Sequence, residues 1–203
     1  GLTKDQIAAL TDGQWQALIQ AGKQGALTAA QIAAIPTNRI TDLNGVALSK
    51  DQVAAMTDAQ WQAFVQAGRQ STLSQTGIEG ISTQRLKQLD ITTLEARQVG
   101  WLTPGQLSAL TKQQVQALSG DQLRAIPDAS VGQLAKHLAK EQIPELTLAQ
   151  MEAVSGTQKK AMGEDERKLL EDLVAVRNLS PADIAGLSRG GVATLTADQL
   201  KDL

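Results

Sequence analysis

The chain has 203 residues, with 19 basic and 21 acidic side chains, three tryptophans, one histidine and no cysteine. A formal net charge of −2 argues against a protein that binds nucleic acid mainly by electrostatic attraction. The absence of cysteine excludes disulfides, zinc–thiolate sites and cysteine nucleophiles, and no apolar run approaches the roughly 20 residues of a membrane-spanning helix.

The chain starts with Gly1, and a repeated sequence pattern is already under way at its first residues and still present at its last ones. The terminal repeats of a repeat protein usually carry polar capping variants. We therefore expect the chain to be part of a longer protein, with Gly1 left by cleavage.

The repeated pattern is an octad, Leu-(Thr/Ser)-x-x-Gln-(Ile/Val/Leu)-x-Ala. Three copies follow one another without a gap at residues 102–109, 110–117 and 118–125. Other clear copies begin at Leu2, Leu10, Leu27, Leu48, Met56, Leu146 and Leu195. Degenerate copies begin at Ile35, Leu73, Ile81, Ile126, Leu179 and Leu187.

A longer duplication overlies the octads. Residues 2–24 and 48–70 are identical at 16 of 23 positions, and the other seven are conservative replacements such as Lys23 for Arg69. The offset is 46 residues, and the correspondence continues more weakly beyond these segments. We therefore read residues 2–47 and 48–93 as two copies of one unit.

The octad predicts many short helices. Along one continuous helix, eight residues turn about 80° beyond two full turns, so the leucines would not share a face. The apolar residues of the octad stand at both odd and even positions, so they would point to both faces of a strand. This pattern excludes a half-buried strand. Thr or Ser followed three residues later by Gln is a capping box, and Pro104 and Pro181 occupy the first helical position after it. Each octad is therefore expected to start a new helix.

Three segments predict longer helices. Residues 15–24 and 61–70 end near Gly22 and Gly68, and residues 164–177 carry acids at their start and a base at their end. The predicted fold is all-α: a solenoid-like or superhelical stack of short capped helices with a few longer ones. We expect a helical octad region over 1–154, a loop or linker over 155–163, and a helix with terminal octads over 164–203 that continues the same fold.

Side chains suited to catalysis are few. His137 is the only histidine and lies beside two lysines, without a recognisable carboxylate partner, so we expect a surface or helix-end residue. The hydroxyls stand mainly at cap positions, the acids of 164–166 suit a helix start, and residues 189–191 suit a turn. We predict no catalytic, cofactor-binding or metal-binding residue, and no enzyme.

The tryptophans allow two interpretations. Trp15 and Trp61 hold equivalent places in the duplication, where large side chains fill a core. Alternatively, exposed tryptophans serve as anchors for a protein partner. Under the second interpretation, the candidate contact residues are Trp15, Trp61, Trp101, Lys23, Arg69 and Arg39.

The octads resemble the tandem Ala-Leu-Thr-x-x-Gln-(Val/Ile)-x repeats of large secreted or surface proteins and secreted effectors of bacteria. The resemblance covers about two thirds of the chain. It implies a bacterial source and a parent protein that is secreted, displayed on the cell surface or translocated into a host, with the cytoplasm as the alternative location. It implies no catalytic residue.

The sequence leaves three hypotheses for function. The first is a non-enzymatic helical-repeat scaffold or docking module for a protein partner, without a cofactor or a membrane span. The second is a regulatory or targeting region of a larger enzyme. The third is a nucleic-acid-binding helical repeat, against which the net charge argues.

Overall fold

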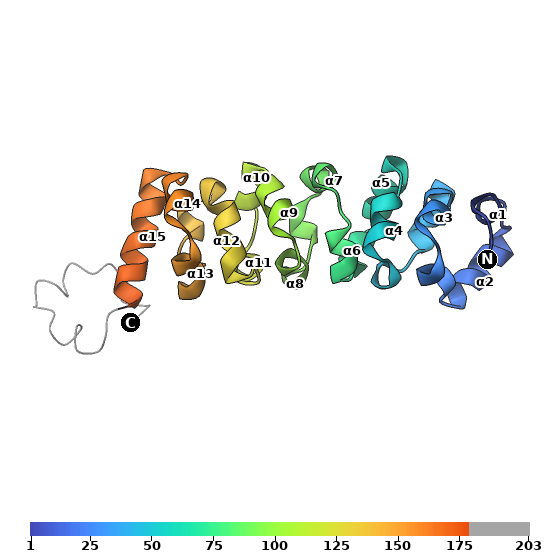
Figure 1. Ribbon diagram of the computed structural model, residues 1–203, viewed down its shortest axis with the longest axis horizontal. Coiled ribbons are helices and arrows are strands. Elements are labelled where there is room, and N and C mark those ends of the chain that lie inside the picture. Colours follow the sequence, from blue (N-terminus) through green and yellow to red (C-terminus); the bar gives the residue numbers. More distant parts are fainter. Residues whose placement is uncertain (179–203) are drawn as a thin grey trace, which may run out of the picture. The chain divides into compact units, whose positions relative to one another are not determined.

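In the computed structural model, residues 1–178 are described, and their regular secondary structure is entirely helical (Figure 1). The predicted all-α class is confirmed. The chain divides into two compact units, residues 1–118 and 119–203, the second described as far as Asn178. The octads predicted from Leu179 onward, Pro181 and the turn at 189–191 lie outside the described residues.

Unit 1 consists of short α-helices joined by 3-10 helices. The α-helices are α1 (Lys4–Ala8), α2 (Asp12–Gln20), α3 (Ala29–Ala33), α4 (Lys50–Ala55), α5 (Asp58–Gln66), α6 (Gln75–Glu79), α7 (Thr83–Gln88), α8 (Ala96–Gly100), α9 (Pro104–Ala109) and α10 (Lys112–Gln116). The 3-10 helices are η1 (Lys23–Ala26), η2 (Thr37–Asp42), η3 (Gly45–Ala47), η4 (Arg69–Thr72) and η5 (Ile91–Thr93). Within this unit α3 packs on α4, α4 on α6, and α7 on α9 (Figure 1).

Unit 2 has α11 (Gly120–Arg124), α12 (Asp128–Val131), η6 (Gly132–His137), η7 (Lys140–Gln142), α13 (Leu148–Ala153), α14 (Gly156–Lys160) and α15 (Glu164–Arg177). The helix predicted over 164–177 is confirmed as α15. The segment 155–163, expected to be a loop or linker, instead contains α14. Ser155 caps this helix with a full capping box, so the same local signal that starts the octad helices operates here.

Capping boxes start the helices of the clear octads among residues 1–178, as predicted, whereas the degenerate octads at Ile35, Leu73, Ile81 and Ile126 have no complete box. In the octad of residues 110–117, the Thr111 hydroxyl accepts from the Gln114 backbone N–H at 3.2 Å, and Gln114 Oε1 accepts from the Thr111 N–H at 3.1 Å. Complete boxes occur at the N-caps Thr3, Thr11, Thr28, Ser49, Thr57, Thr103, Thr111, Ser119, Thr147 and Ser155.

The two longer helices of unit 1 begin earlier than predicted. The helices α2 and α5 start at Asp12 and Asp58, because Thr11 and Thr57 cap them. The chain leaves them through Gly22 and Gly68, whose φ angles of 65° and 71° place them in the left-handed region that glycine tolerates. The predicted helix ends near these two glycines are confirmed.

The core is aliphatic and follows the octad. In residues 110–117, Leu110, Gln114 and Val115 are buried, whereas Lys112, Gln113 and Gln116 are exposed. The octads of residues 102–109 and 146–153 repeat this division at the same three buried places. A helix of five or six residues is unstable in isolation, so these helices depend on contacts with the rest of the chain.

The buried glutamine supplies such a contact, which the sequence analysis did not anticipate. While its Oε1 completes the cap, Gln114 Nε2 donates to the backbone carbonyls of Leu86 at 2.7 Å and Leu89 at 2.8 Å. These acceptors lie 28 and 25 residues earlier in the chain. The same pair of intervals occurs for Gln52, Gln60, Gln98 and Gln106, and intervals of 27 and 24 occur for Gln150.

These bonds explain the length of the duplication. Gln31 donates to the Leu2 carbonyl and Gln52 to the Leu27 carbonyl, so each octad lies against an earlier one. The octads that begin at Leu2, Leu27 and Leu48 are therefore in contact in that order, at steps of 25 and 21 residues. One long and one short step together span the 46 residues of the duplicated unit.

The glutamine contact can be tested with two neighbouring residues of α10. We expect Gln114→Ala to lower the free energy of unfolding by about 2–4 kcal/mol, because it removes half of a capping box and leaves two carbonyls without their donor. The matched change Gln113→Ala, at an exposed position, should alter it by less than about 0.5 kcal/mol. Urea denaturation followed by circular dichroism measures both. Equal effects of the two substitutions would contradict the assigned role of Gln114.

Candidate functional site

Two of the predicted contact residues belong to the core. Trp15 is 1% exposed and Trp61 is 4% exposed, so nearly all of each indole is packed inside unit 1. The core interpretation of these tryptophans is therefore correct, and neither ring is exposed as the anchor interpretation assumed. Trp15 also donates its indole N–H to Asp42 Oδ2 at 2.8 Å, which satisfies its polar atom within the unit.

The other predicted contact residues have different settings. Trp101 is half-buried, with the Arg97 guanidinium carbon 5.8 Å from the centre of an indole ring. Lys23 is exposed and Arg69 is half-buried. Arg39, in contrast, donates to the Leu10 carbonyl at 2.7 Å and pairs with Asp12 at the start of α2. Its side chain is only 14% exposed, so Arg39 links η2 to the start of α2 as a structural brace.

The arginine brace is duplicated together with the octads. Arg85, 46 residues after Arg39, donates to the carbonyls of Val53 and Met56 and pairs with Asp58 at 3.1 Å. Its guanidinium carbon also lies 5.9 Å from the ring centre of Trp61. The second copy of the duplicated unit therefore repeats the contacts that Arg39 makes with Leu10 and Asp12.

Three surface recesses of unit 1 meet at Gln88, at the end of α7. The largest, of about 660 Å³, is lined by residues 87–91 and by residues 111–114 and Ala117. A second, of about 380 Å³, is lined by Trp61, Gln62, Val65, Gln66, Gln88 and Leu89. A third, of about 150 Å³, is lined by Ala54, Asp58, Ser82, Gln84, Arg85 and Gln88. Gln88, which the sequence analysis did not single out, is the residue common to all three.

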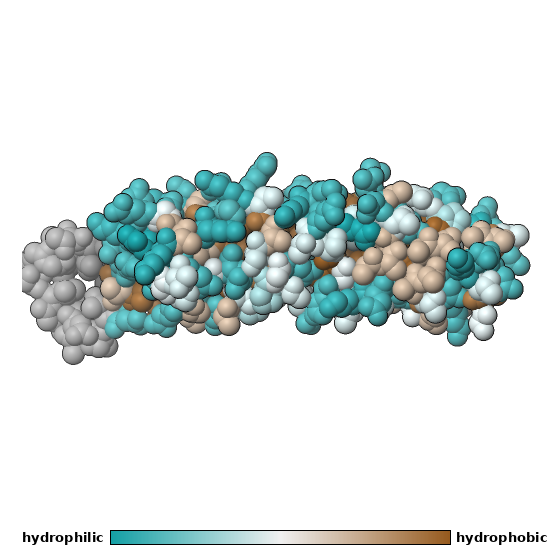
Figure 2. Space-filling model, turned by 45° about the horizontal axis from the view of Figure 1, so that its top comes forward, coloured by the Kyte–Doolittle hydropathy of each residue, from teal (hydrophilic) through white to brown (hydrophobic). Residues whose placement is uncertain are grey.

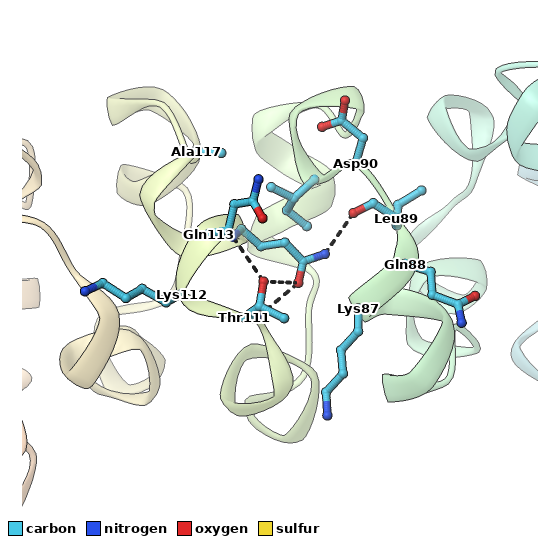
Figure 3. Close-up of a pocket in the computed structure, with 10 residues that line it drawn as sticks. Lys87, Gln88, Leu89, Asp90, Thr111, Lys112, Gln113 and Ala117 are labelled. Atoms are coloured by element: carbon cyan, nitrogen blue, oxygen red, sulfur yellow. Dashed lines mark hydrogen bonds between the residues drawn. The ribbon is translucent and has the colours of Figure 1, made fainter.

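Figure 3 shows the largest recess, which lies between the C-terminal end of α7 and α10. Thr111, Gln114 and Leu89 are among its lining residues, and the hydrogen bonds of Gln114 to Thr111 and to the Leu89 carbonyl join the two segments there. The side chains of Lys87 and Lys112 extend away from that group, and both are exposed. The recess thus combines the hydrogen-bonded side chain of Gln114 with the exposed ammonium groups of Lys87 and Lys112.

Asp90 places a negative charge at the same recess. The Thr92 side-chain hydroxyl and then the Thr92 backbone N–H donate to its carboxylate, at 2.7 and 3.0 Å, and these bonds lower its pKa. The carboxylate is therefore ionised at neutral pH. The recess combines two cationic side chains, one carboxylate and several amides, which suits polar recognition of another molecule.

The part of the chain that the structure describes also bears on other functional classes. Within residues 1–178, no cluster of three or more His, Cys, Asp or Glu side chains is arranged to hold a metal ion. His137, half-buried, is the last residue of η6, at the helix end that the sequence suggested. None of the described helices combines the length and apolar character that crossing a membrane requires.

Comparisons with known proteins add no assignment: no family model, no curated protein and no solved structure matches this chain. The function must be argued from the molecule itself. The signal that would have revealed this site in the sequence is the divergence of the duplicate, where Thr41 and Asp42 correspond to Lys87 and Gln88.

The arginine brace beneath the site yields a test of local stability. We expect Arg85→Lys to lower the free energy of unfolding by about 1–2 kcal/mol, because an ammonium group cannot reproduce the fork of bonds to two carbonyls and Asp58. The control Arg97→Lys affects an exposed pair with Glu95 and should change it by less than about 0.5 kcal/mol. Thermal and urea denaturation measure both variants. An Arg85→Lys variant as stable as the control would contradict the brace.

Proposed function

We propose that this chain is a non-enzymatic scaffold of stacked helical repeats, a solenoid, on which a protein partner docks. Its parent is proposed to be a larger bacterial protein that is secreted or translocated, as the resemblance of the octads implies. The observation that carries the proposal is the division of roles within the octad. The buried leucine, glutamine and valine hold each helix against an earlier one, while the remaining places face solvent.

This division separates stability from recognition. In residues 110–117, the exposed side chains of Lys112, Gln113 and Gln116 make no contribution to the core, so their chemistry is free to differ between octads. The corresponding exposed residues are Pro104, Gly105 and Ser108 in the preceding octad. Repeat proteins of this kind present extended surfaces whose side chains vary over a constant frame. Hydrophilic residues are interspersed with less polar ones on the face seen in Figure 2.

The docking surface is placed at the recesses around Gln88, and we define it by Lys87, Gln88, Lys112 and Gln113. All four side chains are exposed, and they come from the two segments that Gln114 joins. The backbone beneath them is therefore held in one arrangement. A surface that is ordered before binding loses less conformational entropy when a partner docks.

The test uses charge reversal on matched lysines. The chain with Lys87→Glu and Lys112→Glu is compared with a control chain carrying Lys4→Glu and Lys50→Glu, which has the same net charge. Lys112, Lys4 and Lys50 each occupy the first position of a capped helix, so the helix dipole affects them alike. Each immobilised chain is exposed to lysates of bacteria and of candidate host cells, and binding of any retained protein is then measured by calorimetry.

We expect the unmodified chain and the control to bind the same protein with the same affinity. The Lys87/Lys112 variant, with an unchanged melting temperature, should bind it at least about tenfold more weakly, a loss of about 1.4 kcal/mol. Retention of no protein by the unmodified chain would contradict docking and favour a spacer. Equal losses in both variants would show unspecific charge attraction, and retention that nuclease abolishes would favour the nucleic-acid hypothesis.

A further inference from the structure

The two copies of the duplicated unit differ at the tryptophan that each one buries. In the first copy, a carboxylate binds the indole: Trp15 Nε1 donates to Asp42 Oδ2 at 2.8 Å, and Gln16 Nε2 donates to the same oxygen at 3.3 Å. This arrangement is a small carboxylate-binding site made of one indole N–H and one amide. Its ligand is supplied by the chain itself.

The second copy keeps the donors and lacks the carboxylate. Trp61 and Gln62 correspond to Trp15 and Gln16 at the offset of 46 residues, but Gln88 stands in the place of Asp42. The Trp61 indole makes no hydrogen bond among the described residues. Instead, Trp61, Gln62 and Gln88 line the recess of about 380 Å³ described above.

The charges around this recess favour an anion more than those of the first copy do. Lys87 replaces Thr41, Gln88 replaces Asp42 and Asp90 replaces Asn44, so the formal charge of these three positions changes from −1 to 0. The Arg85 guanidinium carbon lies 5.9 Å from the Trp61 ring centre, although Asp58 pairs with it. Asp90, which lines the neighbouring recess, is the opposing negative charge.

We propose that the Trp61 recess binds a carboxylate side chain of a protein partner, in the way that Asp42 is bound in the first copy. Trp61 Nε1 and Gln62 Nε2 are the donors that correspond to those of the first copy, and Gln66 and Gln88 supply further amides at the wall. Hydrogen bonds to an ionised acceptor are about twice as strong as those between neutral groups, which favours Asp or Glu over Asn or Gln. The inference rests on the proposed docking function and specifies the partner as an acidic protein segment.

The test observes the indole N–H resonances by NMR. The probe is N-acetyl-aspartate N-methylamide, and the neutral comparison is N-acetyl-asparagine N-methylamide, both at constant ionic strength. We expect the Trp61 indole proton to move downfield and to saturate with the aspartate compound, and to stay in place with the asparagine compound. The Trp15 indole is the internal control and should not move, because Asp42 already occupies it.

Two exchanged variants make the test independent of any single substitution. Gln88→Asp should move the Trp61 resonance toward the position of Trp15 and abolish its response to the probe. Asp42→Gln should confer a response on Trp15 while leaving that of Trp61 unchanged. The inference is overturned if Trp61 fails to respond, responds equally to both compounds, or if Trp15 of the unmodified chain moves as far.

The outcome is separable from that of the docking test. If a partner binds the surface around Gln88 but the Trp61 resonance ignores the aspartate probe, docking stands and the carboxylate site is refuted. If the resonance responds but no partner requires Lys87 and Lys112, the site stands as a carboxylate site and the docking function fails.

Discussion

The fold depends on a glutamine side chain that is hydrogen-bonded at both ends. Its carbonyl oxygen closes the cap of its own helix, and its amide nitrogen reaches two backbone carbonyls at the end of an earlier helix, as in Gln114. Leucine and valine around it supply the hydrophobic driving force, which is not directional. The glutamine supplies direction, because buried carbonyls without a donor would be costly. It therefore determines which helices lie together.

This constraint explains why helices of five residues persist. Such a segment gains too few internal bonds to offset the entropy of ordering it. In α3 the first turn is closed by the Thr28 capping box, and the carbonyls of Ile32 and Ile35 at its end accept from Gln60, which lies later in the chain. Both ends of the short helix thus have partners. The aliphatic residues between them can then be buried without leaving polar backbone groups unpaired.

The duplicated unit shows how a fixed frame accommodates different surfaces. Arg39 and Arg85 make the same brace, and Trp15 and Trp61 fill the same place in the core. In the first copy, Asp42 accepts a hydrogen bond from the Trp15 indole. In the second copy, Gln88 stands in its place, and the Trp61 indole lines a recess. Other contacts differ as well, since Gln31, which donates to the Leu2 carbonyl, corresponds to Gly77 in the second copy. We propose that divergence of this type gave the second copy its carboxylate-binding recess.

Much of the fold could be predicted from the sequence, because its signals are local. A capping box acts over three residues, so helix starts such as Thr111 were visible, and Gly22 and Gly68 marked the helix ends correctly. The second bond of Gln114 was not predictable, since it depends on which segments pack together across 25 and 28 residues.

The candidate site was less visible in the sequence. Tryptophan suits a core and an interface equally, so the burial of Trp61 required the three-dimensional structure. Arg39 was assigned to the surface because its sequence gives no sign of the carbonyl of Leu10 that it binds. Gln88 drew no attention by itself, and its meaning came from comparison with Asp42 in the first copy.

The central claim is that the octad glutamines join segments of the chain, and the hydrogen exchange of their side-chain amides tests it most directly. NMR distinguishes each glutamine NH₂ group and detects its contacts with other protons. We predict slow exchange and cross-peaks to residues 25 and 28 positions earlier for Gln106 and Gln114, with fast exchange for the exposed Gln113 and Gln116. Equal exchange rates for all four, without the long-range cross-peaks, would contradict the account.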